Sequence, residues 1–183
     1  YFLYRIAEMT WNANHALLPK KRAELKRDLV SARAAKAQDL HDRANQMLLT
    51  ELPKIALSDK FHPVVRVNAM LALGMLDKVE PDITSTAPGK GAEPLAAALP
   101  VLRQAAVDPQ LPEALRVAAL VGIQHHAQLE MSATERGPTA EALVGLVKET
   151  QVGPGRSVTG MQWMRMSAAQ SLGLMVDKWP NVA

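Results

Sequence analysis

Five histidines are the first residues to examine for chemistry, because imidazole serves both as a metal ligand and as a general acid or base. His126 and Glu130 lie four residues apart and share one helical face, and His125 lies one position off that face. Two donors do not complete a metal site, and the chain contains neither a His-Glu dipeptide nor an HExxH motif. We therefore expect no metal site, and we place both histidines near a helix end, where partial positive charge is favourable.

Other catalytic patterns are also missing from the sequence. There is no Gly-x-Ser-x-Gly elbow, and there is no cysteine to supply a nucleophile, a disulfide or a thiolate ligand. Glu141 and Glu149 lie eight residues apart on an expected surface helix, without the apolar setting that separates the pKa values of paired carboxylates. The sequence thus predicts no catalytic residues, no cofactor and no small-molecule substrate, and a protein that is not an enzyme.

One apolar pattern occurs three times along the chain. In each copy an arginine is followed three positions later by alanine and seven positions later by a large aliphatic residue, and these offsets share one side of a helix. The three arginines are spaced 50 and 49 residues apart, which predicts an array of helical repeats. The copies are PVVRVNAMLALGMLD (Pro63–Asp77, with Arg66), PEALRVAALVGI (Pro112–Ile123, with Arg116) and MQWMRMSAAQSLGLMVD (Met161–Asp177, with Arg165).

A second expected helix precedes each copy. The first two, Met47–Asp59 and Pro94–Asp108, carry Leu-Pro inside an apolar helical pattern and end in aspartate. A proline inside a helix removes one backbone hydrogen bond and is expected to bend the helix. The third, Thr139–Thr150, has neither the proline nor the aspartate.

This pairing resembles the HEAT-repeat family, whose unit is two antiparallel helices, the second opening with Pro-x-Val-Arg. The resemblance covers roughly Asp39–Trp179 and implies an all-α solenoid of about three helical pairs. The third unit departs from it, because Met161 replaces the proline. The family's aspartates and arginines commonly form a ladder between successive repeats, and the resemblance assigns that structural role to Asp59, Arg66, Asp108, Arg116 and Arg165.

Composition and loop signals divide the chain into two parts. The chain is 48% hydrophobic but only 4% aromatic, which favours helix stacking, and no period-2 strand pattern is present. Stretches rich in Pro, Gly, Ser and Thr predict loops at 79–92, 131–138 and 151–160. We expect an N-terminal aromatic segment and basic helical arm at 1–38, followed by a repeat array at 39–179 with units at 39–78, 93–128 and 139–179.

The basic arm holds most of the positive charge. Lys20–Lys36 contains seven basic and two acidic residues and so carries a net charge of +5. The whole chain carries +3, so the remainder carries −2. A run of this kind is either a solvated face, which can meet an acidic protein surface, or a phosphate-binding face for nucleic acid or an anionic membrane. The candidate partner-binding residues are Lys20, Lys21, Arg22, Lys26 and Arg27. The aromatic segment before the arm is expected to cap the open end of the array, or else to act as an anchor.

The leading functional hypothesis is a protein–protein interaction scaffold, an adaptor or an accessory subunit of a larger, stable complex, because helical arrays offer an extended surface to partners. Contacts are expected from exposed positions of Asn68–Asp77, Glu113–Gln124 and Gln162–Gln170. The alternatives are a nucleic-acid-binding HEAT-like solenoid that uses the basic arm, and a HEAT-like lyase-type enzyme, which no catalytic constellation supports.

The expected location is soluble or peripheral to a membrane. No uncharged apolar run reaches the ~18 residues of a transmembrane helix. The chain begins with Tyr1 rather than methionine and lacks cysteine, which leans toward an extracytoplasmic location.

Overall fold

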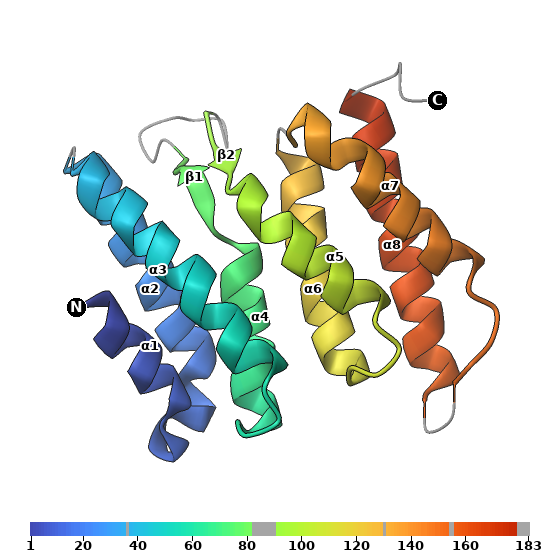
Figure 1. Cartoon of the computed structure of the whole chain (residues 1–183), viewed down its shortest axis with the longest axis horizontal. Coiled ribbons are helices and arrows are strands. Elements are labelled where there is room, and N and C mark those ends of the chain that lie inside the picture. Colours follow the sequence, from blue (N-terminus) through green and yellow to red (C-terminus); the bar gives the residue numbers. More distant parts are fainter. Residues whose placement is uncertain (36, 82–90, 130, 154–155, 179–183) are drawn as a thin grey trace.

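The computed structural model describes residues 1–35, 37–81, 91–129, 131–153 and 156–178, and eight α-helices form nearly all of the regular structure in this part of the chain (Figure 1). The all-α class predicted from the sequence is therefore confirmed. Across the described residues, no helix combines the length and the apolarity that crossing a lipid bilayer requires.

Helices α1 (Phe2–Thr10) and α2 (Leu18–Ala34) form a pair joined by a 3-10 helix at 12–17. Pro19 lies in the first turn of α2, where its missing N–H removes no helical hydrogen bond. Arg5 ties the pair together, because its Nε lies 3.0 Å from Asp28 Oδ2 and its Nη1 lies 3.1 Å from Glu24 Oε2. Both helices pack against α3 (Gln38–Leu57) and α4 (Pro63–Gly74), so the pair covers one side of that unit.

The α3–α4 unit is the best match to the recurring pattern. His62 precedes α4 and its Nδ1 accepts a hydrogen bond from the backbone N–H of Val64 at 3.2 Å, which satisfies one of the first donors of the helix. Pro63 follows in the first turn, where proline is favoured. In α3, Leu40 is 51% exposed, while the neighbouring His41 is 0% exposed and lies on the covered side of the helix.

The remaining helices form two further pairs. The second pair is α5 (Leu99–Val107), which follows a 3-10 helix at 96–98, and α6 (Glu113–Gln128). The third pair is α7 (Ala133–Lys148) and α8 (Val158–Lys178). Within each pair the two helices pack extensively on each other.

The helices lie in two layers (Figure 1). The second helices of the pairs are neighbours, with α6 in contact with both α4 and α8. In the other layer, α5 contacts α7, and α3 continues the row (Figure 1). This arrangement places one long side of α4, α6 and α8 away from the first helices.

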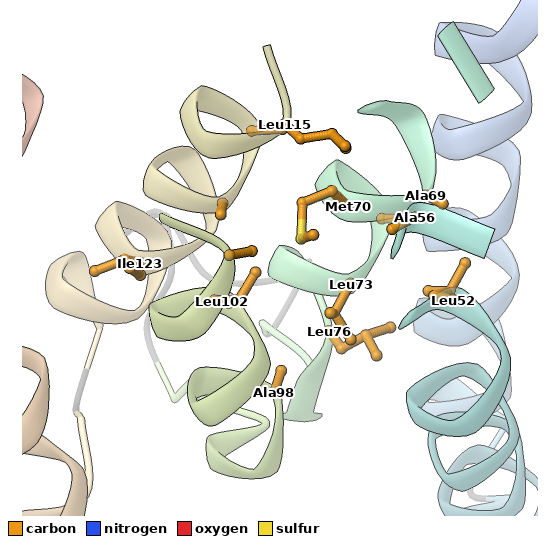
Figure 2. Close-up of a cluster of buried hydrophobic side chains, with 14 of the residues drawn as sticks. Leu52, Ala56, Ala69, Met70, Leu73, Leu76, Ala98, Leu102, Leu115 and Ile123 are labelled. Atoms are coloured by element: carbon orange, nitrogen blue, oxygen red, sulfur yellow. The ribbon is translucent and has the colours of Figure 1, made fainter. Parts of the chain in front are cut away.

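The core runs continuously through the α3–α4 and α5–α6 pairs (Figure 2). Leucine, alanine and methionine side chains from both layers meet there, as the low aromatic content predicts. The labelled members are Leu52, Ala56, Ala69, Met70, Leu73, Leu76, Ala98, Leu102, Leu115 and Ile123.

Two short antiparallel strands, β1 (Asp77–Val79) and β2 (Glu93–Pro94), follow α4, with Asp77 opposite Pro94. The sequence shows no period-2 pattern for these strands, because strands of two and three residues are too short to show alternation. The expected repeat helix also ends earlier than predicted, at Gly74. Most of the predicted loop at 79–92 lies outside the described residues, since 82–90 are not described.

In the first helix of each pair, the position of the proline agrees with the prediction in one case and differs in two. Pro53 lies inside α3 as expected, but Pro100 occupies the first turn of α5, where proline breaks no helical hydrogen bond. The third unit does contain an internal proline, because α7 begins at Ala133 and includes Pro138. The sequence predicts a loop at 131–138, because this stretch shows no apolar periodicity. In the structure, most side chains in the first turns of α7 are exposed.

Candidate interaction groove

Two hollows run across the exposed side of the second helices. The first has a volume of about 320 Å³, lies between α2, α4 and α6, and is lined by Arg22, Leu71, Gly74, Met75, Val121, Gly122, Gln124, His125 and Gln128. The second has a volume of about 400 Å³, lies between α6 and α8, and is lined by Gln124, Gln128, Gln170, Gly173 and Leu174. Because Gln124 and Gln128 line both, we treat the hollows as one surface, the second-helix groove.

The floor of the groove is set by two glycines. A Cβ placed on Gly74 of α4 would lie 2.4 Å from the Cα of Gly122 on α6, so the two backbones meet with no side chain between them. Residues such as Leu71 and Val121 then form walls beside this contact. Small residues at helix crossings allow this close approach, whereas an ordinary pair of helices is separated by 8–10 Å between axes.

Arg22 of α2 forms one end of the groove. Its Nη1 donates a hydrogen bond to Oδ1 of Asn68 on α4, and no carboxylate of the described residues lies within ion-pair distance of it. Burial lowers the pKa of Arg22, because a partly dehydrated site disfavours the charged guanidinium. The groove therefore contains a half-buried cation that has no counter-ion among the described residues.

A buried ionic network holds α2 beside this site. Lys26 Nζ lies 2.6 Å from Asp77 Oδ2 and 2.6 Å from Glu80 Oε2, and it donates a hydrogen bond to the carbonyl oxygen of Met75 at 3.0 Å. Both carboxylate side chains are almost completely buried. Since an unpaired buried charge is costly, Lys26 must stay between them, and this fixes α2 against the end of α4.

Neutral donors and imidazole rings complete the network. Asn45 Nδ2 donates to the carbonyl oxygen of Asp77 at 2.8 Å, and His41 Nε2 lies 3.4 Å from Glu80 Oε1. His125 of α6 places its Nε2 2.9 Å from Asp77 Oδ1, so the network reaches the wall of the groove. Burial alone would raise the pKa of Asp77, but the hydrogen bond from His125 and the charge of Lys26 outweigh it and lower that pKa.

His126 behaves differently from its neighbour. Its side chain is completely buried, and neither ring nitrogen has a hydrogen-bond partner among the described residues. Burial, followed by the adjacent charge of His125, lowers the pKa of His126 to about 4. The ring is therefore neutral at pH 7, and the prediction that both histidines sit at a favourable helix end misses this contrast, because one faces Asp77 and the other faces the core.

The three recurring arginines occupy equivalent positions. Each donates its Nε–H to a carbonyl oxygen near the end of the preceding first helix: Arg66 to Ala56 at 3.0 Å, Arg116 to Ala106 at 2.8 Å and Arg165 to Val147 at 2.9 Å. This satisfies carbonyl groups that a helix end leaves unpaired. The arginines thus tie the two helices of one pair together.

The aspartates predicted to share a ladder with these arginines lie elsewhere. Asp108 Oδ1 accepts a hydrogen bond from the backbone N–H of Gln110 at 2.7 Å and so closes the turn before α6. Asp59 is exposed, and within the described residues no ion pair joins either aspartate to an arginine. Arg116 pairs with a different carboxylate, since its Nη2 lies 3.3 Å from Glu149 Oε2 of the next unit.

The five candidate residues of the basic arm divide between two faces of α2. Lys21 lies 2.9 Å from Glu8 Oε1, Lys26 belongs to the buried network, and Arg22 lines the groove. Lys20 and Arg27 are exposed. The sequence groups all five on one solvated or phosphate-binding face, because the carboxylates that neutralise Lys26 come from a segment about fifty residues away.

Residues of the last connection also have structural partners. Arg156 donates from Nη2 to the carbonyl oxygen of Pro109, and the backbone N–H of Ser157 donates to Glu113 Oε1 at 3.1 Å. Arg156 and Ser157 therefore contact the turn between α5 and α6 and the first residue of α6. Within the described ranges, no group of three histidines, aspartates or glutamates is arranged to hold a metal ion.

No family model matches the chain, and neither the curated proteins nor the solved structures yield a match. The class that the fold and the groove define is an all-α protein built from helical pairs. Any finer grouping rests on the geometry described above.

Proposed function

We propose that this chain is a HEAT-like α-solenoid that serves as a protein–protein interaction scaffold, an adaptor or an accessory subunit of a larger complex. The observation that carries the proposal is the second-helix groove, which crosses α2, α4, α6 and α8. Its lining alternates apolar side chains with amides, the composition of a surface that packs against another protein.

The repeat character of the proposal is supported by the three arginines. Arg66, Arg116 and Arg165 make the same hydrogen bond to the end of their own first helix. Equivalent contacts at equivalent positions are expected of structural repeats. The second helices then line one side of the array, which is the side where the groove lies.

The arrangement of α2 gives the nucleic-acid alternative less support than the groove gives the scaffold proposal. Lys21 and Lys26 face carboxylates, which leaves Lys20 and Arg27 as the exposed members of the predicted basic face. A protein that follows a phosphate backbone presents a series of unpaired cations. The lyase-type alternative gains no supporting constellation among the described residues, and the extracytoplasmic location stays a prediction.

The test is affinity capture from native extract by the wild-type chain and by two matched variants, with and without nuclease. Val121 is 42% exposed in the groove, and Val144 is 37% exposed on α7. We expect Val121→Gln to weaken capture of a stoichiometric protein partner about tenfold, the effect of losing a central apolar contact, while Val144→Gln retains it.

Two results would count against the proposal. Equal capture by both variants would place the partner on another face of the molecule. Capture that disappears with nuclease and falls steeply with salt would favour nucleic acid instead. Circular dichroism of both variants checks that each remains folded.

A further inference from the structure

Arg22 differs from the other inward-facing cations of its helical pair. Arg5, Lys21 and Lys26 each lie within ion-pair distance of two or more carboxylates. Among the described residues, Arg22 meets only the amide oxygen of Asn68, a neutral acceptor. A half-buried guanidinium with no counter-ion keeps an unused attraction for an anion.

The free side of Arg22 has the geometry that carboxylates prefer. Its Nη1 is occupied by Asn68, and within the described residues its Nε–H and Nη2–H make no hydrogen bond. Adjacent N–H groups of a guanidinium bind a carboxylate through two parallel hydrogen bonds. A carboxylate that enters the groove therefore finds a charge and two donors in place.

Asp77, the acidic residue hydrogen-bonded to His125 of the groove wall, does not fill this role. Asp77 uses Oδ2 for Lys26 and Oδ1 for His125, and it lies in the buried network. Apart from His125, which is hydrogen-bonded to Asp77, the other lining residues are glycines or carry apolar or amide side chains, among them Leu71, Val121 and Gln124. No described residue supplies the anion, so we look for it on a partner, and the rest of that ligand must suit a largely uncharged surface.

We propose that the second-helix groove binds a peptide segment of a partner protein that places a glutamate or aspartate carboxylate on Arg22 and an apolar side chain against Leu71 and Val121. This inference rests on the proposed function and specifies the chemistry of the partner. A nucleic acid fits the site less well, since its regular phosphates need several unpaired cations in a row.

The probe is a displayed library of random short peptides, selected on the wild-type chain. The peptides that bind are then synthesised with their acidic residue as it stands and with that residue changed to the corresponding amide. We expect acidic peptides to be enriched and the amide forms to bind on the order of tenfold more weakly, the usual effect of removing a charge-assisted hydrogen bond.

Matched variants of the protein assign the effect to Arg22. Arg22→Gln removes the charge and should weaken acidic peptides by a similar factor, and Arg22→Lys should restore part of the affinity. Arg27→Gln makes the same charge change on the exposed face of the same helix and should leave the affinity unchanged. Thermal unfolding of each variant confirms that the fold persists.

The two proposals fail in different ways. Selected peptides that bind Val121→Gln as tightly as wild type lie outside the groove, and that result overturns the proposed function together with this inference. Peptides that depend on Val121 but carry no carboxylate, or bind Arg22→Gln equally well, overturn only the assignment of Arg22. Binding of a single-stranded oligonucleotide that competes with the peptides and depends on Arg22 would also overturn it.

Discussion

Helices α6 and α8 carry the same recurring pattern, yet their surroundings differ. Helix α6 lies between α4 and α8, so its Arg116 is 1% exposed and its Gly122 meets the backbone of α4. Helix α8 has α6 on one side, and its Met166 is 50% exposed. A Cβ on its Gly173 would meet no atom within 4 Å.

The difference shows that a recurring motif predicts where a residue lies on its helix, but not which residues it contacts. Gly74 and Gly173 both lie eight residues after their arginines, and a leucine directly precedes each of them. Only Gly74 has a neighbouring second helix at that position. Glycine at this position is therefore required for packing in α4 and is open to solvent in α8.

The largest effect is expected for Gly122→Ala. The added Cβ would lie 2.7 Å from Gly74 Cα and 3.0 Å from two methyl carbons of Leu102, and a backbone atom cannot move aside as a flexible side chain can. We expect the free energy of unfolding to fall by about 3 kcal/mol, as in overpacked cores, despite the better helix propensity of alanine. Urea unfolding followed by circular dichroism measures the change.

This prediction also tests the groove. If α4 and α6 separate to admit the methyl group, the distance between Leu71 and Val121 increases and peptide binding weakens with stability. A Gly122→Ala variant as stable as wild type would show that α4 and α6 do not meet at these glycines.

The second-largest effect is a pH dependence of stability caused by His126 in α6, the helix that lies between α4 and α8. The folded pKa of His126 is about 4, against 6.5 for an ordinary histidine, so the unfolded chain takes up a proton before the folded chain does. This lowers stability as pH falls below about 6.5, and the loss levels off below about 4. The shift corresponds to a loss of about 3 kcal/mol.

His126→Leu removes this titration and serves as the reference. We expect the difference in unfolding free energy between wild type and His126→Leu to be constant above pH 7 and to change by about 3 kcal/mol between pH 6.5 and pH 4 in favour of the leucine variant. Asp77 contributes in a lower window, because its depressed pKa means that its stabilisation is lost only below its unfolded value of 3.8. If the difference in unfolding free energy does not change with pH, the His126 ring contacts water or a hydrogen-bond partner in the folded protein.

Sequence reasoning predicts the helical class and the equivalence of the arginines, because both follow from local spacing. The helix of each recurring pattern is found where expected, with Arg66, Arg116 and Arg165 in matching contacts. Helix boundaries are less accurate at the prolines, since proline in a first turn and proline inside a helix look the same in a sequence.

The buried polar network is what the sequence does not reveal. His41 and Asn45 lie on the covered side of α3, but their partners Glu80 and Asp77 come from a segment more than thirty residues later. A histidine and an asparagine four positions apart within an apolar face are a signal that such a pair exists. No local sequence pattern shows that Lys26 belongs to this network, because ion pairs between distant segments depend on the fold.

The smallest effect, and one of opposite sign, is expected for Gly173→Ala. Gly173 lies in α8, its added Cβ has open space, and alanine is favoured over glycine inside a helix by up to about 1 kcal/mol. We expect a rise of several tenths of a kcal/mol in the free energy of unfolding, measured under the same urea conditions as for Gly122→Ala. A loss as large as that of Gly122→Ala would mean that α8 is covered at this position in solution, as α4 is by α6, and the contrast between the middle and the last second helix would then disappear.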